Sequence, residues 1–513
     1  MHHLLCGLAA NPALPGALID RLIGLADDDV DSALACRADL GRARAVALSR
    51  RDAAIAVRLA YSGGLTAADV DPVARPGAAL ALLDEGAGSA QWARRFAADP
   101  VVEHREKLAA CTGLPPDVTD ALAADPETRV VTELALWTTS SDVAARLAGH
   151  PHAEVRSAVA ANEATPSAVL GALVTGDVLP PARWCLVCDR EATPFAHDPH
   201  CDRPGCELPS GAACDGGHES TVHGMYERAL RNPATPAAAV VGFAEHPSPV
   251  LRSLLAARPD LPPPVYRRLA HDSSPAVRAE LAENPAIDEA LIRALAEDPG
   301  HDVRRRLAHH PRVPLDVLAE LADATRIGPT SLPRVVAASP SEVEELAASP
   351  NPTLRMFVAA RRDLPPEIRD ALAEDPDAKV LASIAAHPGL SESRLRAMTG
   401  RHGARVIARV AANPDASPAL LHDLARHRPP VPKALREIAR HPAAPASALL
   451  ACLADPRARP VAAAHPALPP QVVVDLLTDD DEQVAEAAAA NRALPAAEMA
   501  RLVSLADAGA GAF

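Results

Sequence analysis

Aromatic residues are scarce in this sequence, where Phe, Trp and Tyr together make up 2% of 513 residues. A core built on bulky rings is therefore excluded. The apolar fraction of 48% comes mainly from alanine, leucine and valine, which suits thin helices packed closely together. Long apolar runs are missing too, because no stretch reaches the roughly 18 residues that a transmembrane helix needs. We therefore expect no membrane-spanning segment and no membrane partner.

Positive charge is limited as well. The 51 Lys and Arg residues against 66 Asp and Glu residues leave a formal net charge of −15. A negative field disfavours broad contact with phosphate backbones or anionic membranes. A helical-repeat protein that binds nucleic acid is therefore the least favoured of the functions considered below. Only five residues precede Cys6, too few for a signal peptide, so we expect the chain in the cytoplasm.

The common catalytic motifs are absent from the sequence. It has no Gly-rich phosphate loop, no His-Glu-x-x-His pair for a catalytic metal and no Gly-x-Ser-x-Gly nucleophile turn. No residue is therefore predicted to be catalytic, and the chain is interpreted as a non-enzyme.

A period of 26 residues runs through almost the whole chain. It is clearest at Pro259, Pro285 and Pro311, and again at Pro388 and Pro414. A regular period of about 20 to 50 residues indicates a solenoid, in which no unit buries its apolar side alone. Proline-phase positions predict about eighteen units, with degenerate ones near residues 61–90 and 322–340. Those two segments are candidates for kinks or partner-specific surfaces.

Each unit is expected to contain two short helices. In the unit from Pro259 to Pro285, prolines at 262–264 are suited to the first turn of a helix that carries Val265 and Leu269. A second helix should follow Pro275 and carry Val277 and Leu281, four residues apart on one face. Such short helices are not stable alone, so the stripes must merge into one core. The fold prediction is an all-α solenoid.

The repeat consensus resembles a known family. Asn-Pro-x-x-x-Pro is followed by Leu-x-x-Leu-Ala and then by Asp-x-x-x-x-Val-Arg-x-x-Leu-Ala, best seen over 270–285 and 296–311 and again at 154–160. This pattern is similar to the leucine-rich repeat variant (LRV) family over about nine-tenths of the chain. The resemblance implies a right-handed superhelix of alternating α and 3₁₀ helices. HEAT-type repeats share the Asp…Val-Arg half and stay as the alternative, although 26 residues is short for them.

Three polar columns follow the period and are interpreted as parts of the junctions between units. The arginine column is Arg105, Arg156, Arg252, Arg278, Arg304 and Arg355. The aspartate column, expected to cap helices and to pair with arginines of the same or the adjacent unit, is Asp99, Asp125, Asp272, Asp298 and Asp375. The third column, expected to hold hydrogen-bonding turn residues, is Asn11, Asn162, Asn232, Asn284 and Asn413, with His310, His387, His441 and His465 in the same phase. Cys6, Cys36, Cys111 and Cys452 are expected to be buried small apolar residues.

One long interruption breaks the period between Asn162 and Asn232. It contains five of the nine cysteines, in the order Cys185, Cys188, Cys201, Cys206 and Cys214, with His197, His200 and His218 nearby. The segment is polar and rich in turn residues, so it has too little apolar material to fold by burial alone. Metal coordination would supply the missing stability. An odd cysteine count in a cytoplasmic chain argues against a disulfide framework.

The expected ligands are Cys185, Cys188, Cys201 and Cys206, with Cys214 as the alternative to Cys206. The spacing favours structural zinc, with cysteine or histidine as ligands. The LRV resemblance favours a [4Fe–4S] cluster, because some LRV proteins carry a cysteine-rich iron–sulfur module; there it precedes the repeats, whereas here it interrupts them. Both cofactors stay open, with the resemblance leaning to iron–sulfur. A closed four-thiolate site has no open position for substrate.

The sequence therefore predicts an N-terminal repeat arm of about seven units over 1–175, a metal-binding insert over 176–226, a C-terminal arm of about eleven units over 227–506 and a frayed tail over 507–513. The predicted function is a non-catalytic scaffold that binds a protein or peptide on its concave face. The alternative is an iron–sulfur or redox-responsive regulator, in which the metal module alters the stacking of the units.

Overall fold

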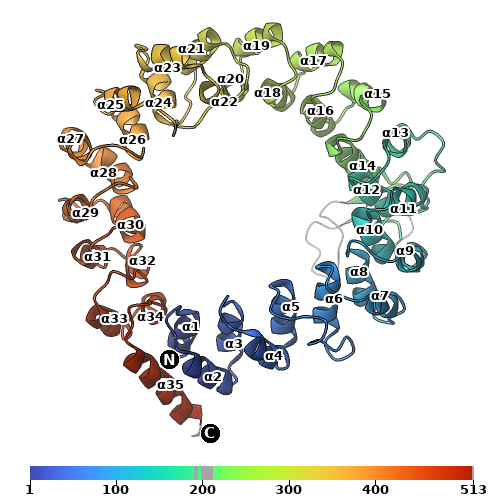
Figure 1. The fold of residues 1–513 in the computed structure, drawn as a ribbon. Coiled ribbons are helices and arrows are strands. Elements are labelled where there is room, and N and C mark those ends of the chain that lie inside the picture. Colours follow the sequence, from blue (N-terminus) through green and yellow to red (C-terminus); the bar gives the residue numbers. More distant parts are fainter. Residues whose placement is uncertain (190–194, 198–211, 511–513) are drawn as a thin grey trace. The chain divides into compact units, whose positions relative to one another are not determined.

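A computed structural model describes residues 1–189, 195–197 and 212–510 of the chain. These residues form 35 α-helices, one 3₁₀ helix (η1) and two strands of two residues each (Figure 1). The predicted all-α solenoid is confirmed. Among the described residues, nearly every unit has an α-helix in both positions, and the single 3₁₀ helix, η1, directly continues α15. The α/3₁₀ alternation implied by the LRV resemblance is therefore not seen in these residues.

The chain divides into two compact units, one made of residues 1–55 with 315–513 and the other of residues 56–314. The helix α5 (Ala53–Tyr61) spans the boundary. The second unit contains α6 (Pro76–Asp84), α7 (Ala90–Ala97), α8 (Val102–Ala109), α9 (Pro116–Ala123), α10 (Thr128–Trp137), α11 (Ser141–Leu147), α12 (Ala153–Ala161), α13 (Ser167–Thr175), β1 (Phe195–Ala196), β2 (Ala213–Cys214), α14 (Glu219–Arg231), α15 (Ala237–Val240), η1 (Val241–Glu245), α16 (Pro249–Ala256), α17 (Pro263–Ala270), α18 (Pro275–Glu283), α19 (Glu289–Ala296) and α20 (His301–Leu307).

The first unit begins with four helices and continues from residue 315. Its helices are α1 (His2–Ala10), α2 (Gly16–Gly24), α3 (Asp28–Ala35), α4 (Arg42–Ser49), α21 (Leu315–Ala324), α22 (Pro333–Val336), α23 (Pro340–Ala347), α24 (Pro352–Ala359), α25 (Pro366–Leu372), α26 (Ala378–Ile384), α27 (Glu392–His402), α28 (Ala404–Ala411), α29 (Pro418–Ala425), α30 (Pro432–Arg440), α31 (Ala446–Cys452), α32 (Arg459–Ala463), α33 (Pro470–Leu476), α34 (Glu482–Ala489) and α35 (Ala496–Ala510). The expected frayed tail is helical as far as Ala510, and its last three residues lie outside the described part.

Within each compact unit, the helices stack in two rows. In the second unit α16, α18 and α20 contact one another in sequence, while η1, α17 and α19 form the neighbouring row (Figure 1). Proline is at the first turn of α17 and α18, as expected. Leu269, Val277 and Leu281 are buried, but α17 turns Tyr266 inward where the sequence favoured Val265. The buried stripe of the first helix therefore consists of Tyr266 and Leu269, three residues apart, in place of Val265 and Leu269.

The asparagine column connects successive units through hydrogen bonds to buried carbonyl groups. Asn413 donates from its amide nitrogen to Ala385 O (2.7 Å) and His387 O (2.8 Å), both in the preceding unit. Its amide oxygen accepts from the N–H of Asp415 at 2.8 Å. A histidine in this column makes two such hydrogen bonds where asparagine makes three. His441 contacts Asn413 O through Nε2 (2.8 Å), and its Nδ1 accepts from Ala443 N (3.1 Å). The hydrogen-bonding role expected of this column is confirmed at these positions.

The arginine column pairs with the aspartate column one unit further along. Arg252 donates from Nε and Nη2 to the two carboxylate oxygens of Asp272, at 2.7 and 3.0 Å. The same bidentate pairing joins Arg105 to Asp125, Arg278 to Asp298 and Arg355 to Asp375. The aspartate lies two residues before the N-cap and not at it: Asp272 accepts from the N–H of Ser274, the N-cap of α18 (2.8 Å). The columns therefore stabilise junctions.

The first repeat stacks on the last one as if it were the next in sequence. α1 packs against α34 and α2 against α35, all within one compact unit (Figure 1). Asn11 donates to Ala489 O (2.9 Å) and Asn491 O (2.7 Å), the same pattern that joins consecutive units. The approach is close, because a Cβ on Gly7 would lie 2.2 Å from the carbonyl oxygen of Glu486. The 26-residue period contains no sign of this contact between distant segments.

No helix among the described residues is both long enough and apolar enough to cross a membrane.

Candidate metal centre

The interruption of the period lies in the second unit, between α13 and α14. α13 ends at Gly176, which has the left-handed conformation typical of a helix end (φ 75°). The chain then passes the start of α12, where Arg183 N donates to Pro151 O (2.7 Å) and Ala153 N donates to Trp184 O (2.8 Å). These backbone bonds fix the segment that leads directly into Cys185.

Arg156 shows how the interruption joins the solenoid. Four other arginines of the column reach an aspartate twenty residues ahead, but the residue twenty positions after Arg156 is Gly176, at the end of α13. Arg156 instead donates from Nη1 to Pro180 O (2.6 Å) and from Nε to His150 O (2.5 Å). Its guanidinium is buried, and this burial lowers the pKa of Arg156. A junction arginine thus holds the first residues of the insert.

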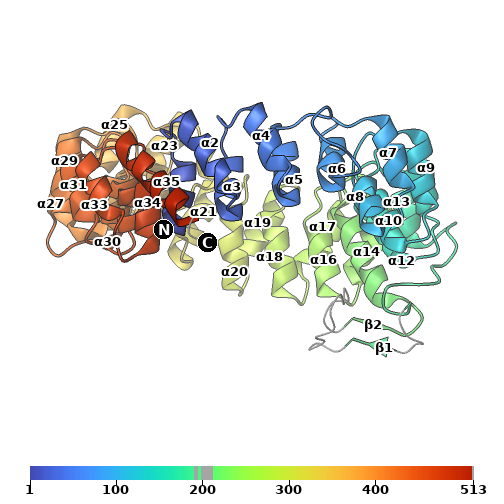
Figure 2. The same ribbon diagram turned by 90° about the horizontal axis from the view of Figure 1, so that it is seen from below.

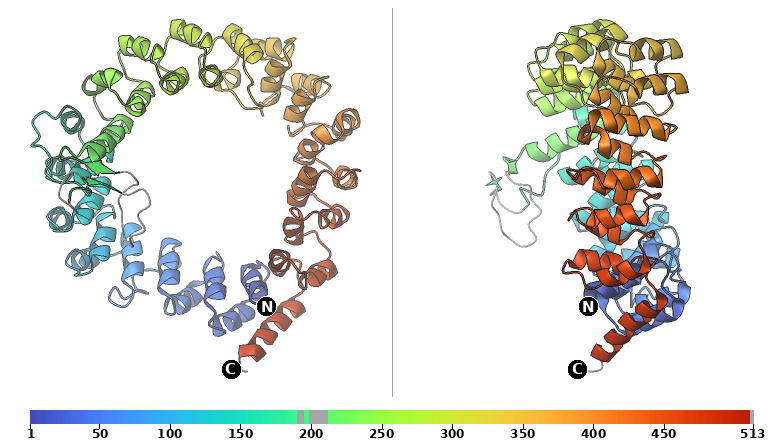
Figure 3. Two further views of the ribbon diagram at one scale, coloured as in Figure 1. Left: turned by 180° about the vertical axis from the view of Figure 1, so that it is seen from behind. Right: turned by 90° about the vertical axis from the view of Figure 1, so that its left-hand side faces the viewer.

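Two short strands form the far side of the insert. β1 pairs antiparallel with β2, with Phe195 opposite Cys214 and Ala196 opposite Ala213. His197 N adds a bond to Ala212 O at 2.7 Å. The strands lie beyond the ends of α12 and α14, to one side of the helix rows (Figures 2 and 3). β2 leads through a tight turn at 215–217 into α14, so Cys214 and the first residue before that helix come close together.

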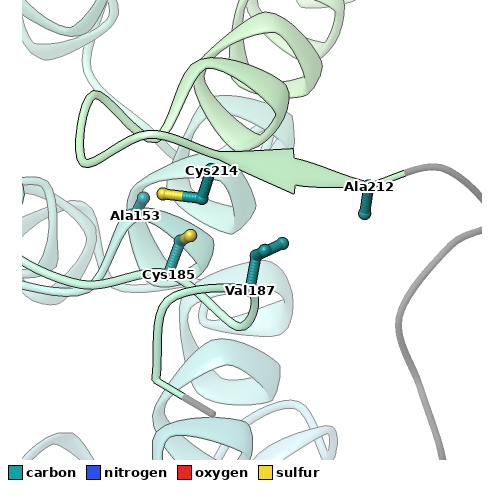
Figure 4. Close-up of a cluster of buried hydrophobic side chains, with 5 residues drawn as sticks. All are labelled: Ala153, Cys185, Val187, Ala212 and Cys214. Carbon is teal, nitrogen blue, oxygen red and sulfur yellow. The ribbon is translucent and has the colours of Figure 1, made fainter. Parts of the chain in front are cut away.

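Four potential ligand atoms meet at this point: the Sγ atoms of Cys185, Cys188 and Cys214 and a ring nitrogen of His218, all within 4.8 Å of one another. The backbone N–H of Cys185 donates to Cys188 Sγ at 3.1 Å, so the two cysteines of the Cys-x-x-Cys turn lie close together. His218, the N-cap of α14, has a left-handed backbone (φ 56°). Its Nδ1 lies 3.6 Å from both Cys188 Sγ and Cys214 Sγ. Figure 4 shows the sulfurs of Cys185 and Cys214 directed into the same space beside Ala153.

The centre is largely closed to solvent. Cys185, Cys214 and His218 are 1%, 3% and 5% exposed, and Val187 and Ala212 complete a small apolar cluster with Ala153 (Figure 4). Burial raises the pKa of the Cys185 thiol to about 12. Burial also opposes ionisation of Cys214, but the backbone N–H groups of Gly216 and His218 and the neighbouring thiols together lower the pKa of that thiol. Buried thiols of this kind are stabilised as thiolates by a cation.

Residues at the start of α12 make further hydrogen bonds to the segments that carry the four ligands. His152, buried at the start of α12, places Nε2 2.9 Å from the Asp189 carboxylate, one residue after Cys188. Its Nδ1 accepts from Glu154 N at 3.3 Å, so His152 also caps α12. Thr221 in the first turn of α14 donates to Glu154 (2.9 Å). The insert and the two helices that it separates in sequence are therefore bonded to each other around the four ligands.

The structure brings together three of the five predicted cysteine ligands, Cys185, Cys188 and Cys214. Cys201 and Cys206, which were expected to complete the set, lie outside the described residues, as does His200. The sequence favoured Cys206 over Cys214 and gave no special place to His218. The available signal was the position of His218, four residues after Cys214 and directly before the helix that resumes the repeat.

The remaining cysteines and one further acidic cluster do not form comparable sites. Cys111 and Cys452 are buried as expected, whereas Cys6 is half-buried and Cys36 is exposed, so the expectation was wrong for Cys36. His2 meets Asp27 (3.0 Å) and Asp29 (2.8 Å) at the surface, where the two carboxylates are its hydrogen-bond partners. The side-chain contacts with Asp29 and Asp27 raise the pKa of His2.

Comparisons with known proteins leave the family open. No family model and no curated protein matches the sequence. Among solved structures, a chain of a homology model of the full-length AP-3 complex is 11% identical, with 96% of this chain and 93% of that chain covered and a TM-score of 0.23. A chain of the Pds5-Scc1 complex is 12% identical, with 96% and 68% covered and a TM-score of 0.16. At these scores the fold assignment rests on the chain's own helices.

Proposed function

We propose that the chain is a non-catalytic scaffold that binds a protein or peptide, and that one structural zinc ion on Cys185, Cys188, Cys214 and His218 holds its insert. The observation that carries the metal assignment is the convergence of four ligand atoms within 4.8 Å of one another. In this proposal the repeat arms flank an insert over 176–226, and several of its described residues, among them Cys185, Val187, Ala212 and Cys214, pack together at the metal centre. The repeat consensus supports an LRV-type array.

The internal use of the polar columns supports the scaffold role. Arginine, aspartate, asparagine and histidine at the repeat phases are bonded between units, for example Arg278 to Asp298 and His310 to Asn284 O. These groups position helices and are not assembled around a common cleft. Within each compact unit, successive helices form a surface, and solenoids use such surfaces to bind extended partners.

The donor set supports zinc over an iron–sulfur cluster. Three cysteines and one histidine form a common structural zinc site, and Zn–S bonds of about 2.3 Å in a tetrahedron place neighbouring sulfurs about 3.8 Å apart. In a [4Fe–4S] cluster each thiolate ligates a separate iron, so the thiolates lie further apart than around one ion. Free thiols persist in a reducing compartment, which supports a cytoplasmic location. The redox-regulator alternative requires iron at this centre.

The metal assignment is tested by substituting each ligand in the full chain. We expect Cys185→Ser, Cys188→Ser, Cys214→Ser and His218→Gln each to lower the zinc content of purified protein, whereas Cys201→Ser and Cys206→Ser retain it. Cys36→Ser, at an exposed cysteine directly after α3, is the matched control. Loss of metal from the Cys201 or Cys206 variant, with His218→Gln unaffected, would show that the ligands were assigned wrongly.

The scaffold role is tested by recovering partners at native expression. Protein tagged at its own locus should co-purify with a defined protein in fixed ratio, and quantitative mass spectrometry measures that ratio against an untagged strain. If no protein is enriched above the untagged strain, while the tagged chain is folded and loaded with metal, the scaffold proposal is wrong.

A further inference from the structure

The second break in the repeat, around residues 322–340, leaves a cavity of about 750 Å³ in the first compact unit. α21 ends at Ala324, and the next helix, α22, has only four residues from Pro333 to Val336. The chain between them has no helix, so the second helix of this unit, which would follow α20 in its row, is reduced to the four residues of α22. The cavity is bounded by this segment and by residues of α24, α26 and α28.

The cavity is cationic in a chain that is acidic as a whole. The net charge of the chain is −15, yet five cationic side chains and one carboxylate line this site. The charged lining residues are Arg326, Arg361, Arg362, Lys379, Arg409 and Asp363. The wall also contains apolar side chains, including Met356 and Val336, and Val336 is 49% exposed. A hollow with both properties is suited to a ligand that is both anionic and partly apolar.

Three of the five cations are available to a ligand. Arg361 is used internally, because it pairs with Asp363 through two bonds of 3.0 and 2.8 Å and donates to Val335 O at 2.6 Å. Arg362 is also used internally, because its Nη1 donates to Ala386 O at 2.7 Å. By contrast, Arg326, Lys379 and Arg409 are exposed, and no carboxylate lies within ion-pair distance of them in the part of the chain that the structure describes. Each comes from a different element, since Arg326 lies in the segment after α21, Lys379 lies in α26 and Arg409 lies in α28.

The spacing of these charges selects the shape of the ligand. α24, α26 and α28 are packed neighbours, and packed helices lie about 8–10 Å apart. Lys379 and Arg409 lie on two such neighbours, and Arg326 lies on the segment that precedes α24 in the chain, so the three charges extend over about 20 Å, further than one phosphate group reaches. An extended peptide advances about 3.3 Å per residue, so about six residues cover this distance. Its alternating side chains would present acidic groups to the cations and an apolar group to Val336 and Met356.

We infer that this cavity, lined by Arg326, Lys379 and Arg409, binds an extended acidic peptide segment of a partner protein that carries an apolar side chain. The inference rests on the proposed scaffold function and names the chemistry of the partner. Complementary charge steers such a segment to a basic hollow on an acidic protein, and the contact should weaken as salt is raised.

The test measures binding of a synthetic peptide to the full, metal-loaded chain by fluorescence anisotropy. The probe has about seven residues, glutamates around a central leucine, and spans about 23 Å when extended. We expect saturable binding that weakens by about tenfold or more in the Lys379→Glu, Arg409→Glu double variant. The matched control is Lys433→Glu with Arg405→Glu, which makes the same change in net charge at exposed positions of α30 and α28 outside the cavity.

Each other outcome has a defined meaning. The inference is wrong if the peptide does not bind, if both double variants weaken it equally, if its glutamine version binds as well, or if a single-stranded oligonucleotide of equal charge or inorganic phosphate alone displaces it at lower concentration. Circular dichroism of both variants checks that the helices are intact. If a native partner is recovered and the Lys379, Arg409 double variant still binds it, the cavity assignment fails while the scaffold function stands.

Discussion

Substitution of Asn413 tests whether the asparagine column holds neighbouring units together. Asn413 is fully buried and makes three hydrogen bonds, two from its amide nitrogen to carbonyl groups of the preceding unit and one to its own turn. Asn413→Ala removes all three hydrogen bonds at once and leaves their partner groups unpaired. Asn413→His imitates His441 in the next unit, which keeps one bond to the preceding unit and one to its own turn.

The structure gives different magnitudes for the two changes. A buried polar group that loses its partner costs about 1–3 kcal/mol, so three such groups should destabilise the junction by at least about 3 kcal/mol in Asn413→Ala. Asn413→His leaves only the carbonyl of Ala385 without its bond, and about 1 kcal/mol is expected. In a solenoid the effect is concentrated at the altered junction, because each unit contacts only its neighbours.

Native-state hydrogen exchange of amides in α26 and α28 measures the free energy of local opening. We expect exchange there to accelerate by about a hundredfold or more in Asn413→Ala and by about tenfold or less in Asn413→His. Amides of α18 in the other compact unit serve as an internal reference. If the alanine and histidine variants exchange alike, or if alanine accelerates exchange by less than about fivefold, the column does not stabilise the junctions as described.

Two further predictions concern the contact between the ends of the chain and the effect of pH. Gly7→Ala should weaken the packing of α1 on α34, because its Cβ would lie 2.2 Å from Glu486 O, whereas Gly24→Ala, with open space around it, should stabilise its helix by up to about 1 kcal/mol; faster exchange of α1 amides in the first variant alone checks this. Burial lowers the pKa of His310, so its stabilising contribution is complete above the unfolded value of about 6.5 and is lost as the pH falls toward the folded value. Thermal unfolding from pH 7.5 to 5 should therefore show a smaller loss of stability in His310→Asn than in the original chain, and equal pH profiles would refute the assignment.

The fold could be predicted from the sequence because the repeat places the same kinds of residue at the same positions in many units. Proline in the first turn and an apolar residue such as Leu269 or Leu281 in each helix specify two short helices per unit. The junction role of Asn284 and of Arg278 followed from the same periodicity. Which of two adjacent apolar residues is buried could not be predicted, because Val265 and Tyr266 are both apolar and packing decides which one turns inward.

The metal centre could be predicted only in part from the sequence, and the contact between the chain ends could not be predicted at all. A Cys-x-x-Cys turn is a local pattern, so Cys185 and Cys188 were found directly. The partners of these cysteines depend on how β2 and α14 return to them, and spacing alone did not favour Cys214 and His218. The stacking of α1 on α34 joins residues more than 470 positions apart, as in the bond from Asn11 to Ala489. A repeat consensus specifies that units stack, but not which terminal units meet.

The metal content of the purified chain tests the central claim most directly. Protein purified without oxygen should be colourless and should contain one zinc ion per chain by elemental analysis and native mass spectrometry, and His218→Gln should reduce that content strongly. A brown protein with about four iron atoms per chain, or a folded chain that retains no metal, would contradict a Cys185, Cys188, Cys214 and His218 zinc centre.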